Sequence, residues 1–364
     1  MWYNKQERMS VMSSRAKKKN RNATGEKALS VTPPVPAKKS KTKRIVCISA
    51  LVTAGLLIFA LLADLILAWS LVHTWITPEK NGWTQAPTEV GIWHETFELD
   101  TVNGKVYGWV MAAQQPVDED AEEWLPPEEY SDKTVVFASN YDNTRELLDL
   151  GGVDYFVDFC KEGYNVVTFD WTGSGLSEGD QNAFLLDKTK ELRTVVNYAL
   201  EKTDADFLAV QGIGFGCYPA AQITAEMAEV DALILDSCYD RFSDVLFGRF
   251  DAWAGAWDLA PIRATAEWLF PLMTDADPDE CSLSRWISRM QGKYIFFIQG
   301  ESDELFGVQP AKDLAALAAL NSANRVTSWL LPNVGHLRAR TYDTETYFAK
   351  ISAFLTQART EPQT

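Results

Sequence analysis

Three glycines at alternate positions follow a short apolar run and precede a helix-forming segment. The run spans 206–211, and the glycines are Gly212, Gly214 and Gly216. In a G-x-S-x-G elbow, a strand, a sharp turn and a helix hold a serine hydroxyl above a sheet, beside backbone N–H groups that bind an oxyanion. Gly214 occupies the serine position. The segment therefore predicts the backbone for nucleophilic catalysis without the atom that attacks.

Two other interpretations of these glycines stay open. Alternate glycines also occur where a turn is tight or where a helix closely approaches a strand. A dinucleotide-binding loop likewise follows a strand and opens a helix. The rest of the chain must decide between these interpretations.

The elements that would position such a site alternate along the chain after residue 92. The first, 92–113, is a predicted antiparallel hairpin around Asn103-Gly104, a dipeptide preferred in tight turns. Besides the strand and helix around the glycines, we expect strands at 134–139, 164–171, 230–237, 294–300 and 326–331, and helices at 155–161, 183–201, 310–320 and 344–355. This alternation predicts an α/β fold with a mostly parallel sheet covered on both faces.

One segment, 239–281, interrupts the alternation and is rich in aromatic residues. It contains Trp253, Trp257 and Trp268. We interpret it as a helical lid over the sheet edge where α/β folds bind ligands. Additional helical packing against the body is the alternative interpretation.

The segment 45–72 is apolar apart from Asp64 and a few small polar residues. A helix of roughly 20 residues crosses the hydrocarbon core of a bilayer, so we predict a transmembrane helix; a buried core helix is the alternative. Positive charge stays cytoplasmic, and tryptophans such as Trp69 and Trp75 suit the opposite interface. The expected topology is a cytoplasmic tail at 1–44, the membrane span, a linker at 73–91 and a domain outside the cell membrane.

Charge separates the tail from the domain. Residues 1–44 hold 13 Lys/Arg and 2 Asp/Glu, a net charge of +11, and their composition predicts disorder. Because the whole chain carries −16, residues 45–364 carry −27. An acidic domain argues against nucleic acid as a partner. The five cysteines and three histidines show no metal-ligand spacing, so we expect no metal and no cofactor.

Three further segments make 93–355 resemble the α/β-hydrolase superfamily, in particular its bacterial membrane-anchored esterases and serine aminopeptidase-like members. Residues 170–179 read D-W-T-G-S-G-L-S-E-G, similar to the family loop D-x-R-G-x-G-x-S-E-G, with Thr172 where arginine is usual. Residues 300–304 read G-E-S-D-E and 333–337 read N-V-G-H-L, similar to the segments that carry the catalytic acid and base. The resemblance implies an eight-stranded α/β-hydrolase domain at 92–358 with a lid at 239–281, followed by a short tail at 359–364.

The resemblance also implies roles for individual residues. His336 takes the position of the catalytic base, Asp303 that of the acid that orients it, and Gly214 that of the nucleophile. The Phe215 amide is one expected oxyanion donor, and the side chain of Asn140 could supply the second N–H where the family usually has His-Gly.

Two functions follow as hypotheses. The first is a membrane-anchored, catalytically impaired hydrolase homologue that acts by binding a small-molecule or lipid-like ligand, or an envelope protein. The second is an active hydrolase of ester, amide or lipid-like substrates. It would use a relocated nucleophile, or a water molecule activated by His336 and Asp303. Cys217 is an unfavourable replacement nucleophile because it falls in the first helical turn after the elbow and points back toward the sheet.

Overall fold

The computed structural model describes residues 41–113, 129–141, 143–181, 186–274 and 276–361. The chain divides into two compact units, one ending at Leu56 and one beginning at Leu57. The predicted disorder of the tail falls on residues 1–40, outside the described residues, whereas 41–44 form the first turn of a helix instead.

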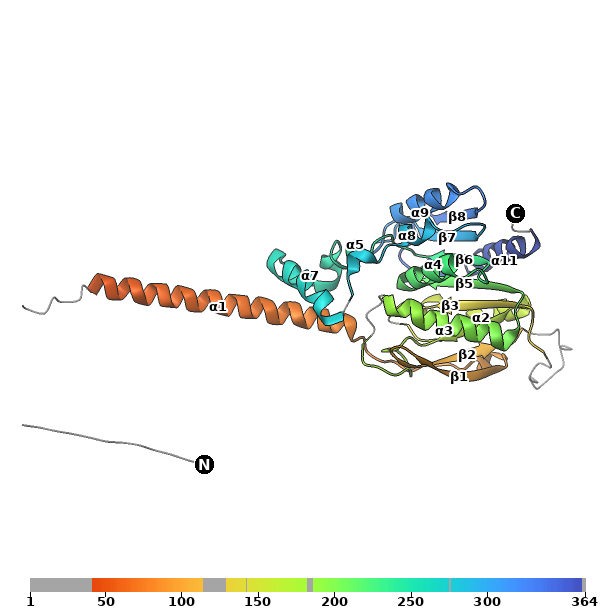
Figure 1. Cartoon of the computed structure of the whole chain (residues 1–364), viewed down its shortest axis with the longest axis horizontal. Coiled ribbons are helices and arrows are strands. Elements are labelled where there is room, and N and C mark those ends of the chain that lie inside the picture. The colour runs from red at the N-terminus through yellow and green to blue at the C-terminus, as the bar shows by residue number, and fades with distance from the viewer. Residues whose placement is uncertain (1–40, 114–128, 142, 182–185, 275, 362–364) are drawn as a thin grey trace, which may run out of the picture. The chain divides into compact units, whose positions relative to one another are not determined.

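A single eight-stranded sheet forms the centre of the second unit, in the order β1-β2-β4-β3-β5-β6-β7-β8 (Figure 1). β1 and β2 pair antiparallel around the predicted Asn103-Gly104 turn, β2 pairs antiparallel with β4, and the remaining pairs are parallel. The strands are β1 (His94–Thr101), β2 (Gly104–Met111), β3 (Lys133–Ala138), β4 (Asn165–Phe169), β5 (Phe207–Ile213), β6 (Ala232–Asp236), β7 (Tyr294–Gly300) and β8 (Arg325–Leu331). The mostly parallel sheet expected from the sequence is confirmed.

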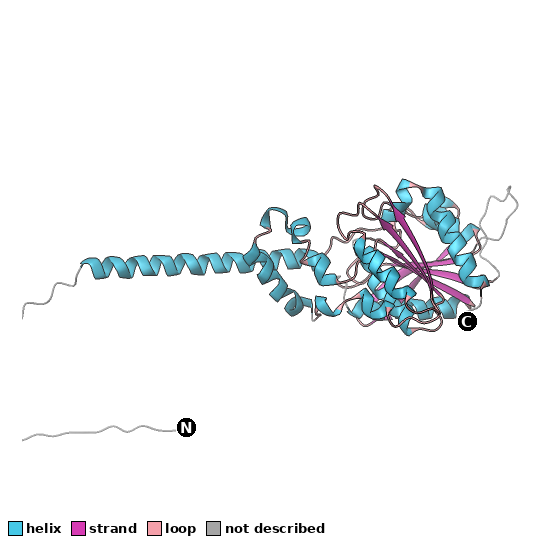
Figure 2. Cartoon of the chain, turned by 90° about the horizontal axis from the view of Figure 1, so that it is seen from above, coloured by secondary structure: helices cyan, strands magenta, loops and turns pink. Residues whose placement is uncertain are grey.

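Helices cover both faces of this sheet (Figure 2). Alternate residues of β5 enter two different cores: Leu208 and Val210 face one, and Ala209 and Ile213 face the other. The first core is closed by α3 (Leu186–Thr203), α4 (Cys217–Glu226), α8 (Leu283–Ile287) and α9 (Gln309–Ala319), and the second by α2 (Asp154–Lys161), α10 (Ala339–Tyr342) and α11 (Thr344–Thr360). Strands that are apolar on both sides are typical of buried parallel sheets.

The helix before the sheet, α1 (Lys41–Ile76), is long and apolar enough to cross a membrane. It extends beyond the predicted end at residue 72, into the segment predicted as a linker. Its last turn continues because Val72, Trp75 and Ile76 are buried in the first core, which stabilises the helical conformation there. The prediction that Trp75 lies at a membrane interface is therefore wrong.

An insertion at 237–293 separates β6 from β7 and contains the aromatic segment. Its helices are α5 (Phe242–Leu246), α6 (Phe250–Ala254), α7 (Ala260–Thr274) and α8. The buried residues of α7 belong to the same core as the last turns of α1.

Candidate active site

The three alternate glycines form a sharp turn between β5 and α4. Gly214 has a φ of 55°, a left-handed conformation that glycine adopts without strain. A Cβ at Gly216 would lie 2.1 Å from the carbonyl oxygen of Ala138, so this position accepts only glycine for a different reason. The strand, turn and helix therefore have the layout predicted for a nucleophile elbow, and Gly214 has no side chain at the turn.

Asn140, just after β3, occupies the space in front of this turn. Its side-chain Oδ1 accepts a hydrogen bond from the backbone N–H of Phe215, with an N···O distance of 3.1 Å. In this conformation Asn140 thus presents its oxygen to the Phe215 amide, and the donation of its N–H to an oxyanion stays a prediction. A Cβ added to Gly214 would lie only 2.6 Å from the same Oδ1.

His336 and Asp303 lie together after β8 and β7. His336 Nδ1 and Asp303 Oδ2 are 2.9 Å apart. The other carboxylate oxygen of Asp303 accepts backbone N–H groups of Leu305 and Phe306 at 2.9 and 2.8 Å, and Gln299 Nε2 donates to Oδ2 at 2.8 Å. Four hydrogen bonds therefore fix the carboxylate that would orient the imidazole.

The backbone around His336 is unusual. Asn333 and Leu337 on either side of it, and Ser237 at the end of β6, have positive φ angles of 61°, 52° and 56°. Such conformations cost non-glycine residues free energy and gather at functional sites. The Leu337 N–H donates to Ser237 Oγ at 3.1 Å, so this hydrogen bond joins the histidine turn to β6.

A cleft of about 460 Å³ brings the two groups of residues together. Asn140 and Phe215 line it from the elbow side, and His336 lines it from the other side. Glu304 and Arg338 add opposite charges to its wall. Of the sequence-predicted site residues, Asn140, Phe215 and His336 therefore share one cleft, whereas Gly214 and Asp303 contact these residues without lining it.

Solved structures with a similar fold include esterases and a peptidase. An esterase of Pyrococcus furiosus superposes with a TM-score of 0.61 over 78% of this chain and 99% of that chain, at 20% identity. A carboxyl esterase of Bacillus coagulans gives a TM-score of 0.53 at 14% identity, covering 73% of this chain and 98% of that chain. An acylaminoacyl peptidase of Pyrococcus horikoshii gives 0.53 at 13% identity, covering 73% and 41%. Protein-family models and curated protein sequences give no match.

The chain has the α/β-hydrolase fold. The strand order and these neighbours remove the dinucleotide-binding interpretation of the glycines, which belongs to a differently ordered sheet.

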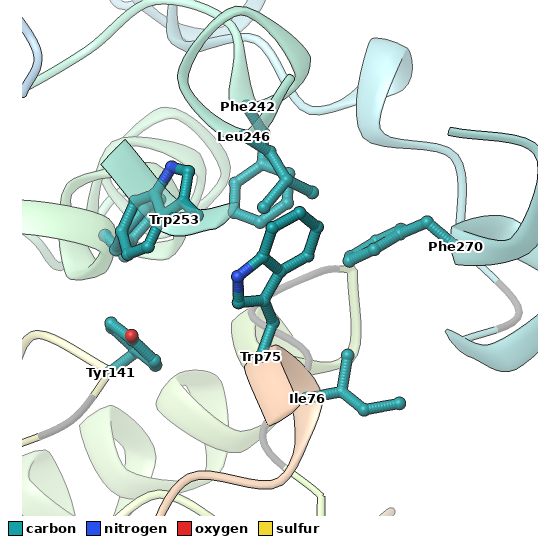
Figure 3. Close-up of a pocket in the computed structure, with 8 residues that line it drawn as sticks. Trp75, Ile76, Tyr141, Phe242, Leu246, Trp253 and Phe270 are labelled. Atoms are coloured by element: carbon teal, nitrogen blue, oxygen red, sulfur yellow. The ribbon is translucent and has the colours of Figure 1, made fainter. Parts of the chain in front are cut away.

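A second, apolar cavity adjoins the elbow of this α/β-hydrolase fold, and the sequence did not reveal it. Its free volume is only about 20 Å³ because Trp75 projects into it (Figure 3). The Trp75 ring packs edge-on against Phe250 and Trp253, with centroids 5.7 and 6.5 Å away. The lining residues are Trp75, Ile76, Tyr141, Phe215, Phe242, Leu246, Trp253 and Phe270.

The three tryptophans predicted for a lid have different surroundings. Trp253 lines both cavities and donates its indole N–H to the carbonyl of Val245 at 3.2 Å. Trp257 and Trp268 are 49% and 61% exposed, and they are absent from the walls of these two cavities as far as the described residues define them. Only Trp253 is therefore placed to contact a ligand in the cleft.

Cys217 is the nearest thiol in sequence to the elbow. Its side chain is fully buried, and its Sγ lies 3.3 Å from the carbonyl oxygen of Gly212. Burial raises the pKa of the thiol well above its usual value, which keeps it protonated and unreactive. Across the described residues, no group of three or more His, Cys, Asp or Glu side chains is arranged to hold a metal ion.

Proposed function

We propose that this protein is a membrane-anchored, catalytically impaired hydrolase homologue that acts by binding. The observation that carries the proposal is the pair Gly214 and Asn140. Gly214 supplies no nucleophile, and Asn140 Oδ1 occupies the Phe215 N–H that would otherwise bind an oxyanion. Acyl transfer needs both groups, since the nucleophile forms the covalent bond and the N–H stabilises the charge that develops.

The apolar cavity beside the elbow supports this proposal. Trp75 of α1 lines this cavity together with Phe215, the residue that follows the nucleophile position. An acyl chain attacked at the elbow would need room on this side, and the remaining free volume of about 20 Å³ holds little more than a water molecule. The cleft of about 460 Å³ is large enough for a small ligand or for a protruding protein segment. A small-molecule or lipid-like ligand, or an envelope protein, is the class of partner that we propose for it.

Labelling with a fluorophosphonate tests the loss of serine chemistry. We expect the full-length protein in detergent to form no adduct under conditions in which an active esterase is fully labelled. An adduct on any serine that disappears in the His336→Ala variant would contradict the proposal and indicate a relocated nucleophile.

An active hydrolase that uses water directly is the second candidate. The specific observation in its favour is the hydrogen-bonded pair of His336 and Asp303 beside the cleft. General base catalysis alone is worth about 10²–10⁴-fold. Slow turnover of acyl esters without a burst, lost in both His336→Ala and Asp303→Asn, would establish this function. Turnover that is equal in wild type and His336→Ala would exclude it.

The membrane anchor is part of the same proposal. α1 would cross the cell membrane once, with residues 1–44 in the cytoplasm and the hydrolase-fold domain outside. Protease added to intact cells should remove the domain and leave the tail protected. Digestion of the tail with the domain protected would reverse the orientation.

A further inference from the structure

The outer face of α7 is an exposed apolar stripe. Trp268 and Leu272 are 61% and 62% exposed, and Pro261 and Ala264 continue the stripe toward the beginning of the helix at helical spacing. The opposite face of α7 is buried, through Ile262, Ala266 and Leu269. The turn before α7 adds Trp257 and Leu259, which are also exposed. We refer to Trp257, Leu259, Pro261, Ala264, Trp268 and Leu272 as the α7 stripe.

The α7 helix lies alongside the second half of α1, as both views show (Figures 1 and 2). Thr265 Oγ1 donates a hydrogen bond to Asp64 Oδ2 at 2.6 Å. Further along both helices, Phe270 of α7 and Trp75 of α1 line the same cavity. Phe270 lies five residues after Thr265, and Trp75 lies eleven residues after Asp64. The two helices therefore run in the same direction, and the start of α7 lies toward the part of α1 that precedes Asp64.

We propose that the α7 stripe inserts into the outer interfacial layer of the membrane that α1 crosses. This inference rests on the proposed anchor. About 20 helical residues span the hydrocarbon core, so a span that begins at Ile45 reaches its outer boundary near Asp64. Thr265 is fixed at that level by its hydrogen bond, which places the beginning of α7 at or just inside the boundary.

The composition of the stripe suits this environment. Tryptophan is enriched where a protein passes the headgroup layer, and the stripe contains two exposed tryptophans. The apolar surface also continues onto α1, where Leu61 and Ile66 are 69% and 63% exposed. Exposed apolar patches of this kind mark sites of interaction rather than free surface.

The charged residues near the α7 stripe either form an ion pair or line a different cleft. Asp258 forms an ion pair with Arg263 at 2.5 Å. Arg263 and Glu267 line a separate polar cleft with Asp277, on a different side of α7. The charged side chains of α7 therefore lie beside the stripe rather than within it.

Depth-dependent quenching of a single fluorophore tests this arrangement in the full chain. Cys47 is an exposed native cysteine and is replaced by serine, whereas Cys160, Cys217, Cys238 and Cys281 are buried. An environment-sensitive dye is then attached to a cysteine at Trp268 or Leu272. Leu320, 82% exposed at the end of α9, is the matched control, and Phe59 on α1 reports on the anchor. The protein is reconstituted in phosphatidylcholine and phosphatidylglycerol vesicles that carry a quencher near the headgroup or deep in the acyl chain.

We expect blue-shifted emission at Trp268→Cys and Leu272→Cys, with stronger quenching by the shallow than by the deep quencher, and neither effect at Leu320→Cys. Quenching at Phe59→Cys alone would leave the anchor in place and overturn the inference about α7. A blue shift at Trp268→Cys that depends on protein concentration but not on quencher lipid would also overturn it, because a second copy of the chain would then cover the stripe. Absence of quenching at all positions would overturn the anchor itself, and this inference with it.

Discussion

The two sides of the cleft, which we name for the roles proposed above, differ in their side chains: the acid-base side carries His336 and Asp303, and the nucleophile side carries Gly214 and Asn140. On the acid-base side, Asp303 and His336 form a hydrogen bond of the kind that a catalytic acid and base share. On the nucleophile side, Gly214 has no reactive atom, Asn140 lies against it, and Trp75 lines the small cavity next to Phe215.

Asp303 also has contacts other than its hydrogen bond with His336. Asp303 accepts the backbone N–H groups of Leu305 and Phe306, so its carboxylate also stabilises the turn after β7. Removing a buried acceptor from such a network costs about 1–3 kcal/mol for each unsatisfied donor. A structural role in the turn after β7 is therefore sufficient to explain the presence of Asp303.

The largest expected effect concerns the packing of Trp75 on the nucleophile side. Trp75→Ala should lower the free energy of unfolding by about 3–5 kcal/mol, because it leaves a cavity between α1 and the elbow. Chemical denaturation of the full-length protein in detergent measures this loss. Added indole should restore part of the stability by filling the cavity. Trp257→Ala, at an exposed position, is the control and should change stability by less than about 0.5 kcal/mol. Equal losses in the two variants would show that Trp75 does not fill this side of the cleft.

Restoring the nucleophile tests whether Asn140 blocks the site. Gly214→Ser alone should label slowly with fluorophosphonate, because Asn140 Oδ1 occupies the Phe215 N–H. Gly214→Ser combined with Asn140→Gly should label about 10²–10³-fold faster, which is the effect of one oxyanion donor. Adding His336→Ala should abolish the gain. Fast labelling of the single variant would mean that Asn140 moves aside readily and that the missing serine is the only defect.

Asp236 is buried at the end of β6, behind the acid-base side of the cleft. Its carboxyl group should make the free energy of unfolding depend on pH. Burial raises the pKa of its carboxyl from 3.8 to about 6, although Tyr347 and Ser237 donate hydrogen bonds to it. A raised carboxyl pKa means that the folded state holds the proton more tightly. Stability from this group is therefore complete below about pH 4 and is lost as the pH rises to about 6.

The Asp236→Asn variant isolates this contribution, because it cannot ionise. Relative to the variant, the wild type should lose roughly 2 kcal/mol of unfolding free energy between pH 4 and 6. Asp343→Asn is the control with the opposite sign, since the pKa of Asp343 is lowered by the Thr346 N–H at the start of α11. A wild-type curve parallel to that of Asp236→Asn would show that Asp236 has an ordinary pKa.

The sequence predicted the sheet and the backbone of the site because both depend on local patterns. Alternating apolar strands and the three spaced glycines define the elbow without reference to distant residues. Which side chains occupy the site could not be predicted, because their contacts join residues that are far apart in the sequence. Trp75 and Phe215 are 140 residues apart in sequence, and Asn140 and Phe215 are 75 apart. The orientation of the Asn140 amide is set by which group of Phe215 faces it, and residue type alone does not reveal this.

The smallest effect is the coupling between Gly214 and Asn140, and a double-mutant cycle measures it directly. Gly214→Ala places a methyl group at a φ of 55°, which costs a non-glycine residue about 1 kcal/mol. The same methyl group would lie 2.6 Å from Asn140 Oδ1, so Asn140 must move and lose its hydrogen bond from Phe215. The backbone cost remains when Asn140 is replaced by alanine, whereas the steric cost disappears. Gly214→Ala should therefore destabilise the wild type by about 1 kcal/mol more than it destabilises Asn140→Ala, within the range observed for residues in contact. Additive effects would mean that the Asn140 side chain does not lie against Gly214 in solution. The nucleophile side of the cleft would then lack only a serine hydroxymethyl group.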